Sequence, residues 1–219
     1  MDIFFNKKGF RKPYSEGFSL IELVVAITIF IALTTTLLFN YNSFNKHVTL
    51  DTLAHQIAQW VRDAQVSAMS VKRSNTSITP FPGYGLHFDI TTPKKFIYFA
   101  DLNNNKKYDP PVLPAKCGDP LEECEKEIDM FQGNTLDSLC GEVSAPAFPA
   151  LTPLCGGTLG TSQTFDIVFT RPNPDADIGG DQNSTTSPVS YDRADITVAS
   201  PFGYKRTVEV WTTGQITVQ

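Results

Sequence analysis

The sequence has few of the residues and none of the motifs that enzymes commonly use for chemistry. It has three histidines in 219 residues, and no carboxylate or nucleophile stands at a motif spacing from any of them. The glycine-rich patterns of phosphate and dinucleotide loops are absent, as are the H-E-x-x-H pattern of zinc proteases and the G-x-S-x-G pattern of hydrolases. We therefore expect a protein that is not an enzyme.

Charge is also scarce, and its sign is unevenly distributed. The formal net charge is −5, which argues against nucleic acid as a partner, because binding to a polyanion requires an excess of lysine and arginine. The first 17 residues carry four basic and two acidic side chains, a net +2, which leaves −7 for the rest of the chain. A basic start on an acidic body is typical of a cytoplasmic leader on an exported protein.

A long apolar run follows the basic segment. Residues 18–39 read FSLIELVVAITIFIALTTTLLF, and Glu22 is the one formal charge among them. At a rise of about 1.5 Å per residue, a helix of this length spans a bilayer core of about 30 Å. Because the basic residues come before the run, we expect the N-terminus to stay in the cytoplasm and the residues after Phe39 to lie outside it.

Each of three ordinary explanations leaves some feature of this apolar run unexplained. A secretory signal has a shorter apolar region and a small-residue cleavage site, whereas NYNSFNK follows here. A buried core helix would be shorter and would show polar residues on one face. A plain membrane anchor leaves Glu22 unexplained, since a carboxylate near the centre of a span costs about 2.5–3.5 kcal/mol and by default marks a function.

Residues 17–26, GFSLIELVVA, resemble the G-F-T-L-I-E-L motif of prepilins of type IV pili and pseudopilins of type II secretion. The resemblance implies that a prepilin peptidase cleaves after Gly17 and methylates the new amine of Phe18. It also implies that Glu22 pairs with the amine of a neighbouring subunit during assembly. The implied partners are the peptidase, other pilin or pseudopilin subunits and the inner membrane, with a filament in the periplasm or outside the cell as the destination.

Two departures and three weaker matches refine the resemblance. The leader is long, and Phe39 stands where many major pilins have a proline, which favours a minor pilin or a pseudopilin. Residues 62–68, 84–88 and 213–218 resemble segments of the H-type minor pseudopilins. The domain order that follows is a leader at 1–17, a membrane helix at 18–39, an amphipathic helix half at 40–74 and a β-rich head at 75–219.

The pattern after the apolar run predicts an α+β fold of pilin type, in which one long helix packs on an antiparallel sheet of about four to six strands. Apolar residues at spacings of three and four form one stripe on the second half of the helix: Leu50, Ala54, Ile57, Val61, Ala64, Ala68 and Val71. Short alternating runs predict the strands. These runs are 84–90, 95–100, 164–170, 194–199, 207–211 and 215–218.

A segment rich in cysteine, proline and glycine, residues 110–163, is expected to be a long loop inserted in the head. It holds all four cysteines, whose spacings do not match the C-x2-C pairs of zinc sites. In an exported segment an even number predicts two disulfides, and three connectivities are open. The pairing with the shortest loops joins Cys117 to Cys124 and Cys140 to Cys155.

Oxygen-bearing side chains recur from residue 101 to residue 109 as in an EF-hand loop. The ligands predicted for calcium, the one cofactor considered, are Asp101, Asn103, Asn105, Asp109 and the carbonyl of Lys107. The pattern is incomplete, because Lys106 replaces the turn glycine and Val112 the closing glutamate. The alternative is a polar turn after a strand.

Two hypotheses of different class follow for the whole chain. The first is a structural subunit, a minor pilin or pseudopilin that helps to initiate or cap a filament for secretion, adhesion or DNA uptake. The second is a surface adhesin or receptor, in which the pilin stem presents the Cys-rich loop to a partner.

Overall fold

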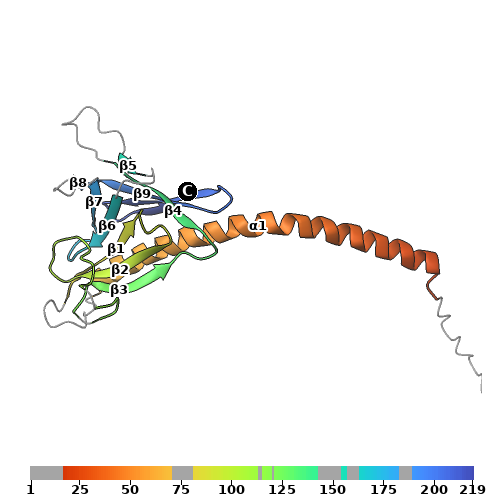
Figure 1. The fold of residues 1–219 in the computed structure, drawn as a ribbon, viewed down its shortest axis with the longest axis horizontal. Coiled ribbons are helices and arrows are strands. Elements are labelled where there is room, and N and C mark those ends of the chain that lie inside the picture. The colour runs from red at the N-terminus through yellow and green to blue at the C-terminus, as the bar shows by residue number, and fades with distance from the viewer. Residues whose placement is uncertain are drawn as a thin grey trace, which may run out of the picture. The chain divides into compact units, whose positions relative to one another are not determined.

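The computed structural model describes residues 17–70, 81–112, 115–119, 121–142, 154–156, 163–182 and 189–219. One long helix, α1, extends from Leu20 to Met69, and strands follow it (Figure 1). The chain divides into two compact units, Met1–Phe44 and Asn45–Gln219. Helix α1 therefore contributes its first half to one unit and its second half to the other.

The first unit consists, where it is described, of the apolar half of α1. Residues Leu20–Leu38 have a mean hydropathy of 2.3, and among the described residues α1 is the one helix that is long and apolar enough to cross a membrane. The hydroxyls of Thr28 and Thr35 donate to the carbonyls of Val25 and Ile31 at 2.8 and 2.7 Å. These bonds satisfy the hydroxyls within the helix, as an apolar surrounding requires.

In the second unit, α1 packs on the sheets through the predicted stripe. Leu50, Ile57 and Val61 are at most 1% exposed, and so are the small residues Ala54 and Ala64. Burial of each large aliphatic side chain contributes about 1.5–3 kcal/mol to folding. The predicted stripe is confirmed for its described members, whereas Val71 and the predicted end of the helix at 74 lie outside the described residues.

Two antiparallel sheets complete the second unit. A six-stranded sheet has the order β3-β2-β1-β6-β7-β8, and a five-stranded sheet has the order β11-β10-β9-β4-β5. The strands of the first are β1 (Gly83–Asp89), β2 (Lys95–Asp101), β3 (Cys124–Asp129), β6 (Gln163–Phe169), β7 (Ala176–Gln182) and β8 (Val189–Ser190). Those of the second are β4 (Thr135–Glu142), β5 (Leu154–Gly156), β9 (Arg193–Ala199), β10 (Lys205–Trp211) and β11 (Ile216–Val218).

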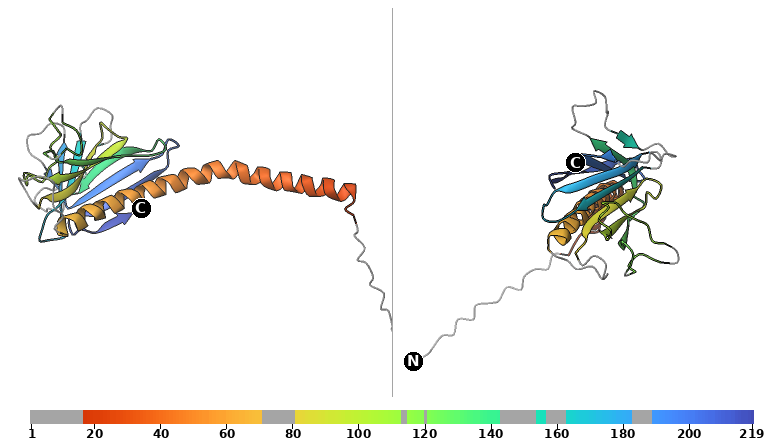
Figure 2. Two further views of the ribbon diagram at one scale, coloured as in Figure 1. Left: turned by 90° about the horizontal axis from the view of Figure 1, so that it is seen from below. Right: turned by 90° about the vertical axis from the view of Figure 1, so that its left-hand side faces the viewer.

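One core joins the helix to both sheets. Tyr84, Leu86 and Phe88 alternate along β1 with residues that face the other way, and all three are fully buried. They share a cluster with the α1 stripe and with Ile196 and Val208 of the second sheet. Figure 2 shows the second half of α1 lying along the strands. The predicted α+β, pilin-like fold class is thus confirmed.

The sheets are larger than predicted, because part of the expected loop at 110–163 forms strands. β3, β4 and β5 all start within this segment, and β3 and β4 pair with the predicted strands β2 and β9. β3 was missed because four of its six residues are charged. β4 was missed because a register shift between Leu136 and Ser138 breaks the alternation of apolar and polar residues.

β7 was also missed, since it contains Asp177 and Asp181, and aspartate is uncommon in strands. Its glycine pair, Gly179-Gly180, looks like a turn in the sequence. In the structure Gly180 lies against the edge of the Tyr191 ring, and an added Cβ would meet Tyr191 and the Thr164 carbonyl at 3.0 Å. The glycine is therefore required by close packing within a strand.

Candidate functional site

The predicted cleavage junction lies just before α1. Gly17, Phe18 and Ser19 precede the helix, whose first hydrogen bond runs from the amide of Leu23 to the carbonyl of Ser19 at 3.2 Å. Phe18 is 83% exposed. The peptide bond between Gly17 and Phe18 is therefore in non-helical, exposed chain, as a peptidase requires. The leader residues 1–16 lie outside the described residues.

Glu22 occupies the first turn of α1 and is exposed. A carboxylate at this place complements the partial positive charge of the helix N-terminus. Val25 and Ala26, three and four positions further along the helix and therefore on the same side of it, are apolar. The carboxylate is thus available to a cationic group from outside the chain.

The loop after β2, residues 102–109, is organised around a buried carboxylate. Asp101 is fully buried, and its two oxygens accept hydrogen bonds from the amides of Asn105 at 3.0 Å and Lys106 at 2.9 Å. Asn104 and Lys106 have φ angles of 59° and 61°, a conformation that asparagine tolerates better than lysine. Burial raises the pKa of Asp101, although the amides oppose this shift.

Glu123, which sequence reasoning missed, closes the same loop. It is 5% exposed, and its carboxylate accepts hydrogen bonds from the amides of Leu102 at 3.2 Å and Asp109 at 2.8 Å. Burial raises the pKa of Glu123 to about 7, and the charges of Asp109 and Asp101 add to the effect. The sequence held no signal for this role, because Glu123 follows another glutamate in a stretch without periodicity.

The structure places the predicted calcium ligands in one loop but turns their polar groups toward each other. The side-chain amides of Asn103 and Asn105 donate to the Asp109 carboxylate at 2.7 and 2.9 Å. The described residues contain no group of three His, Cys, Asp or Glu side chains that could hold a metal ion. Calcium binding at Asp101, Asn103, Asn105, Lys107 and Asp109 stays a prediction.

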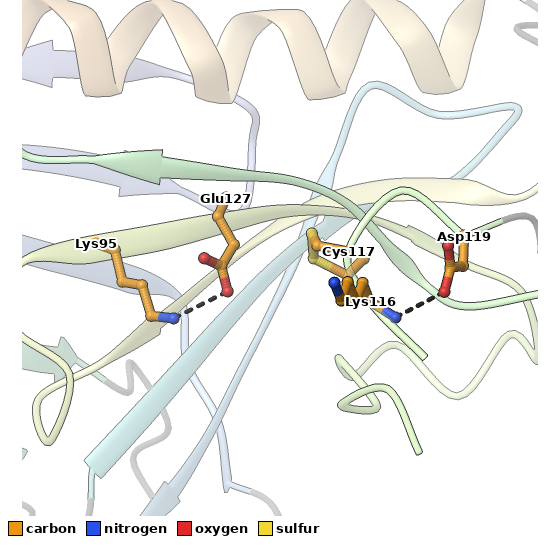
Figure 3. The surroundings of a disulfide bond; sticks show 6 residues. Lys95, Lys116, Cys117, Asp119 and Glu127 are labelled. Carbon is orange, nitrogen blue, oxygen red and sulfur yellow. Dashed lines mark hydrogen bonds and ion pairs between the residues drawn. A yellow bond between two sulfur atoms is a disulfide. The ribbon is translucent and has the colours of Figure 1, made fainter. Parts of the chain in front are cut away.

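The first predicted disulfide is present. Cys117 is bonded to Cys124, with the two Cα atoms 4.7 Å apart, next to the ion pair of Lys95 and Glu127 (Figure 3). Cys124 packs in a small second cluster with Phe99, Tyr108 and Val168. The disulfide thus fastens the segment after β2 to the outer face of the six-stranded sheet.

The second disulfide is described in part. Cys140 on β4 is disulfide-bonded, and the backbone of Cys155 on β5 lies directly opposite it. Residues directly opposite in an antiparallel pair have their Cβ atoms close together. This register favours the predicted Cys140–Cys155 pairing, which stays a prediction because the side chain of Cys155 lies outside the described residues.

His87 and Asp166 form a pair that the sequence did not reveal. The side chain of His87, a residue of β1, is 13% exposed, and its Nδ1 lies 2.7 Å from Asp166 Oδ1. The two residues are direct neighbours on β1 and β6. They meet only through strand register, which cannot be read from their separation of 79 positions.

Comparison with known proteins adds one finding. The prokaryotic N-terminal methylation motif, the prepilin-type cleavage and methylation signal of type IV pilins and pseudopilins, matches residues 12–38. This match covers the end of the basic segment from Lys12, the residues Gly17, Phe18 and Glu22, and the apolar half of α1 as far as Leu38. No curated protein and no solved structure matches the chain.

Proposed function

We propose that this chain, which carries the prepilin processing motif of type IV pilins and pseudopilins, is a minor structural subunit of a type IV pilus-like or type II secretion filament. The observation that carries the proposal is the motif at residues 12–38, because it includes an exposed apolar helix segment of membrane-spanning length, Leu20–Leu38. The helix then continues into a folded head without a break. In this role the protein is a substrate of an enzyme and not an enzyme itself.

Processing separates the leader from the mature chain at Gly17. A prepilin peptidase and methyltransferase cleaves this bond on the cytoplasmic side and methylates the amine of Phe18. The exposed, non-helical backbone at Gly17–Ser19 supports this step. The basic leader supports an N-terminus in the cytoplasm, with the head on the other side of the inner membrane.

Glu22 directs assembly in this proposal. A carboxylate within an apolar span costs about 2.5–3.5 kcal/mol near the helix centre, and this cost falls when a cation pairs with it. The methylated amine of Phe18 in a neighbouring subunit is such a cation. Exposed apolar residues around Glu22, including Ile21 at 67%, leave room for a neighbouring helix.

We also propose the H-type minor pseudopilins as the subfamily. Its support is the order of elements: the long helix, β1 with the Tyr84–Phe88 segment, and the terminal β10 and β11. The cysteines agree with export, because disulfides persist in oxidising compartments such as the periplasm.

The second hypothesis, an adhesin whose Cys-rich loop binds a partner, has a different structural basis from the one expected. Much of that segment belongs to β3 and β4, and the Cys117–Cys124 disulfide lies on the sheet. Deleting the segment would remove strands from both sheets. Single substitutions on the outer face are therefore the appropriate test of binding.

The assembly role is tested with Glu22→Gln in cells that make the matching filament. We expect the variant to be cleaved and methylated normally, yet to be lost from the sheared filament fraction in which the unchanged chain is recovered. Gln56→Glu, an exchange on the head half of α1, is the matched control and should be recovered normally. Incorporation of Glu22→Gln at the unchanged level would contradict the role of Glu22.

A further inference from the structure

The outer face of the six-stranded sheet, opposite the core, carries a row of side chains from four neighbouring strands. Glu127 pairs in register with Ile97, Ile97 with His87, and His87 with Asp166. Side chains at such positions point to the same face of a sheet. Polar groups on both sides of Ile97 thus lie within reach of one small molecule.

The segment after β2 turns this row into a cleft. Tyr108 is 6% exposed and packs on Phe99 and on His87, with ring centroids 5.4 and 4.8 Å apart. Together with the Cys117–Cys124 disulfide it forms a wall beside the row. The cleft has a volume of about 490 Å³, and it is lined by His87, Lys95, Ile97, Tyr108 and Glu127 among others. A cleft of this size matches the sites that bind small molecules.

The hydrogen bond with Asp166 determines whether the free ring nitrogen of His87 donates a hydrogen bond to a ligand or accepts one from it. A carboxylate only accepts hydrogen bonds, so the proton between the two side chains belongs to Nδ1 in the neutral imidazole. The other ring nitrogen, Nε2, is then an acceptor. Within the described part of the chain, Asp166 is the only hydrogen-bond partner of the His87 side chain. A ligand that contacts Nε2 of the neutral ring must therefore bring a donor.

The second polar pair in the cleft offers both kinds of group without a net charge. Lys95 Nζ lies 2.9 Å from Glu127 Oε1, and the two side chains are 36% and 47% exposed (Figure 3). Each keeps hydrogen-bonding capacity after this contact, since an ammonium has three donors and a carboxylate several acceptor positions. An anion would be attracted by Lys95 but repelled by Glu127 and by the Nε2 lone pair. A cation would be attracted by Glu127 but repelled by Lys95. Asp89 and Lys107 also line the cleft and add one charge of each sign, so the lining favours neither an anion nor a cation.

We propose that this cleft binds an uncharged ligand rich in hydroxyl groups, of the saccharide class. A hydroxyl donates and accepts at once, so neighbouring hydroxyls satisfy His87 Nε2, Glu127 and Lys95 together. The apolar face of a sugar ring packs on Ile97 between them. The Asp166–His87 pair, the Lys95–Glu127 pair and the disulfide-fastened wall are the features that define the site.

The test uses the full chain in a detergent without a sugar head group, labelled with carbon-13 and nitrogen-15 at histidine. The pH is chosen from the ring nitrogen shifts so that the His87 ring is neutral. Lactose, maltose and cellobiose are titrated separately, and inorganic phosphate and acetate serve as charged probes. We expect at least one disaccharide to shift the His87 ring signals in a saturable manner, while phosphate and acetate leave them unchanged.

Glu127→Gln should weaken the binding of that disaccharide by about tenfold, because a neutral amide oxygen replaces the charged acceptor of a hydrogen bond. Glu142→Gln is the matched control, since Glu142 is 48% exposed and also pairs with a cation, Arg193, but belongs to the other sheet. It should leave the affinity unchanged. Saturable binding of phosphate or acetate in place of the sugars would overturn the proposal, and so would the absence of any shift at His87 with all three disaccharides.

Discussion

The two halves of α1 use the same kind of side chain in opposite ways. In the first half Ile29 is 55% exposed, whereas in the second half Ile57 is completely buried. Both residues lie in one continuous helix, Leu20–Met69. The difference shows that local helix formation is independent of what the apolar side chains contact, because those of the first half are exposed and those of the second half pack against two sheets.

We expect the largest loss of stability when a buried side chain in the second half of α1 is truncated. Ile57→Ala removes a buried side chain and should lower the free energy of unfolding of the head by about 2–5 kcal/mol. Ile29→Ala removes the same atoms from an exposed position and should leave the unfolding of the head unchanged. Urea denaturation of the full chain in detergent, followed by tryptophan fluorescence, measures both. Equal losses would contradict the division of α1 into two roles.

The second predicted effect is a pH dependence of the free energy of unfolding of the head. Burial raises the pKa of Glu123 from 4.5 to about 7, so folding favours the protonated carboxyl. The contribution of Glu123 to stability is therefore fully present below about pH 4.5 and is lost as the pH rises to 7, by about 3 kcal/mol in total. Glu123→Gln should remove this part of the pH dependence of the unfolding free energy.

Glu122→Gln, next in the sequence, is the control and should keep the pH dependence. A Glu123→Gln chain whose stability falls with rising pH as steeply as before would show that another group is responsible.

The same assay checks the calcium prediction. Calcium bound at Asp101 and its neighbours should raise the unfolding midpoint at the upper end of this pH window, and an unchanged midpoint would contradict it.

A smaller effect is expected from the close packing of the strands. An added Cβ on Gly141 would overlap the ring of Tyr191, whereas an added Cβ on Gly179 would meet nothing within 4 Å. Gly141→Ala should therefore cost about 1–3 kcal/mol, as overpacked substitutions in cores do. Gly179→Ala should be neutral or slightly stabilising. Thermal unfolding of the two variants distinguishes them, and a neutral Gly141→Ala would show that the ring does not lie against the strand.

The smallest effect concerns the surface of the head. Lys205 Nζ lies 2.7 Å from Asp137 Oδ2, and the two side chains are 57% and 29% exposed. Exposed ion pairs contribute little, so Asp137→Asn should lower the unfolding free energy by less than about 1 kcal/mol. Its effect should shrink further in high salt, because ions screen exposed charges. A loss comparable to that of Ile57→Ala would contradict the central role of the buried stripe.

Periodicity predicted the parts of the fold in which one environment acts on a long stretch of chain. The apolar half of α1 and the stripe from Leu50 to Ala68 are of this kind. Periodicity failed to predict strands whose own residues do not alternate between apolar and polar, because pairing with neighbouring strands stabilises these elements. β3 is largely charged because it forms an edge of its sheet, and charged edges resist further pairing.

The residues of the candidate sites also divide into those that a local pattern predicted and those that it did not predict. Gly17, Phe18 and Glu22 lie within one short motif, so their spacing was sufficient to single them out. Glu123 and the His87–Asp166 pair depend on contacts between distant positions, and a single sequence does not carry the register that brings them together. Glycines gave a misleading signal for β7, because close approach of an aromatic ring and a tight turn both require them.

The most direct test of the central claim is the intact mass and N-terminal sequence of the chain, made together with a prepilin peptidase. We expect a mature chain that begins at methylated Phe18, and we expect Gly17→Ala to abolish this product. A chain that still begins at Met1, or one that is cut near Asn40, would contradict processing by the prepilin peptidase and leave an ordinary anchored or secreted protein.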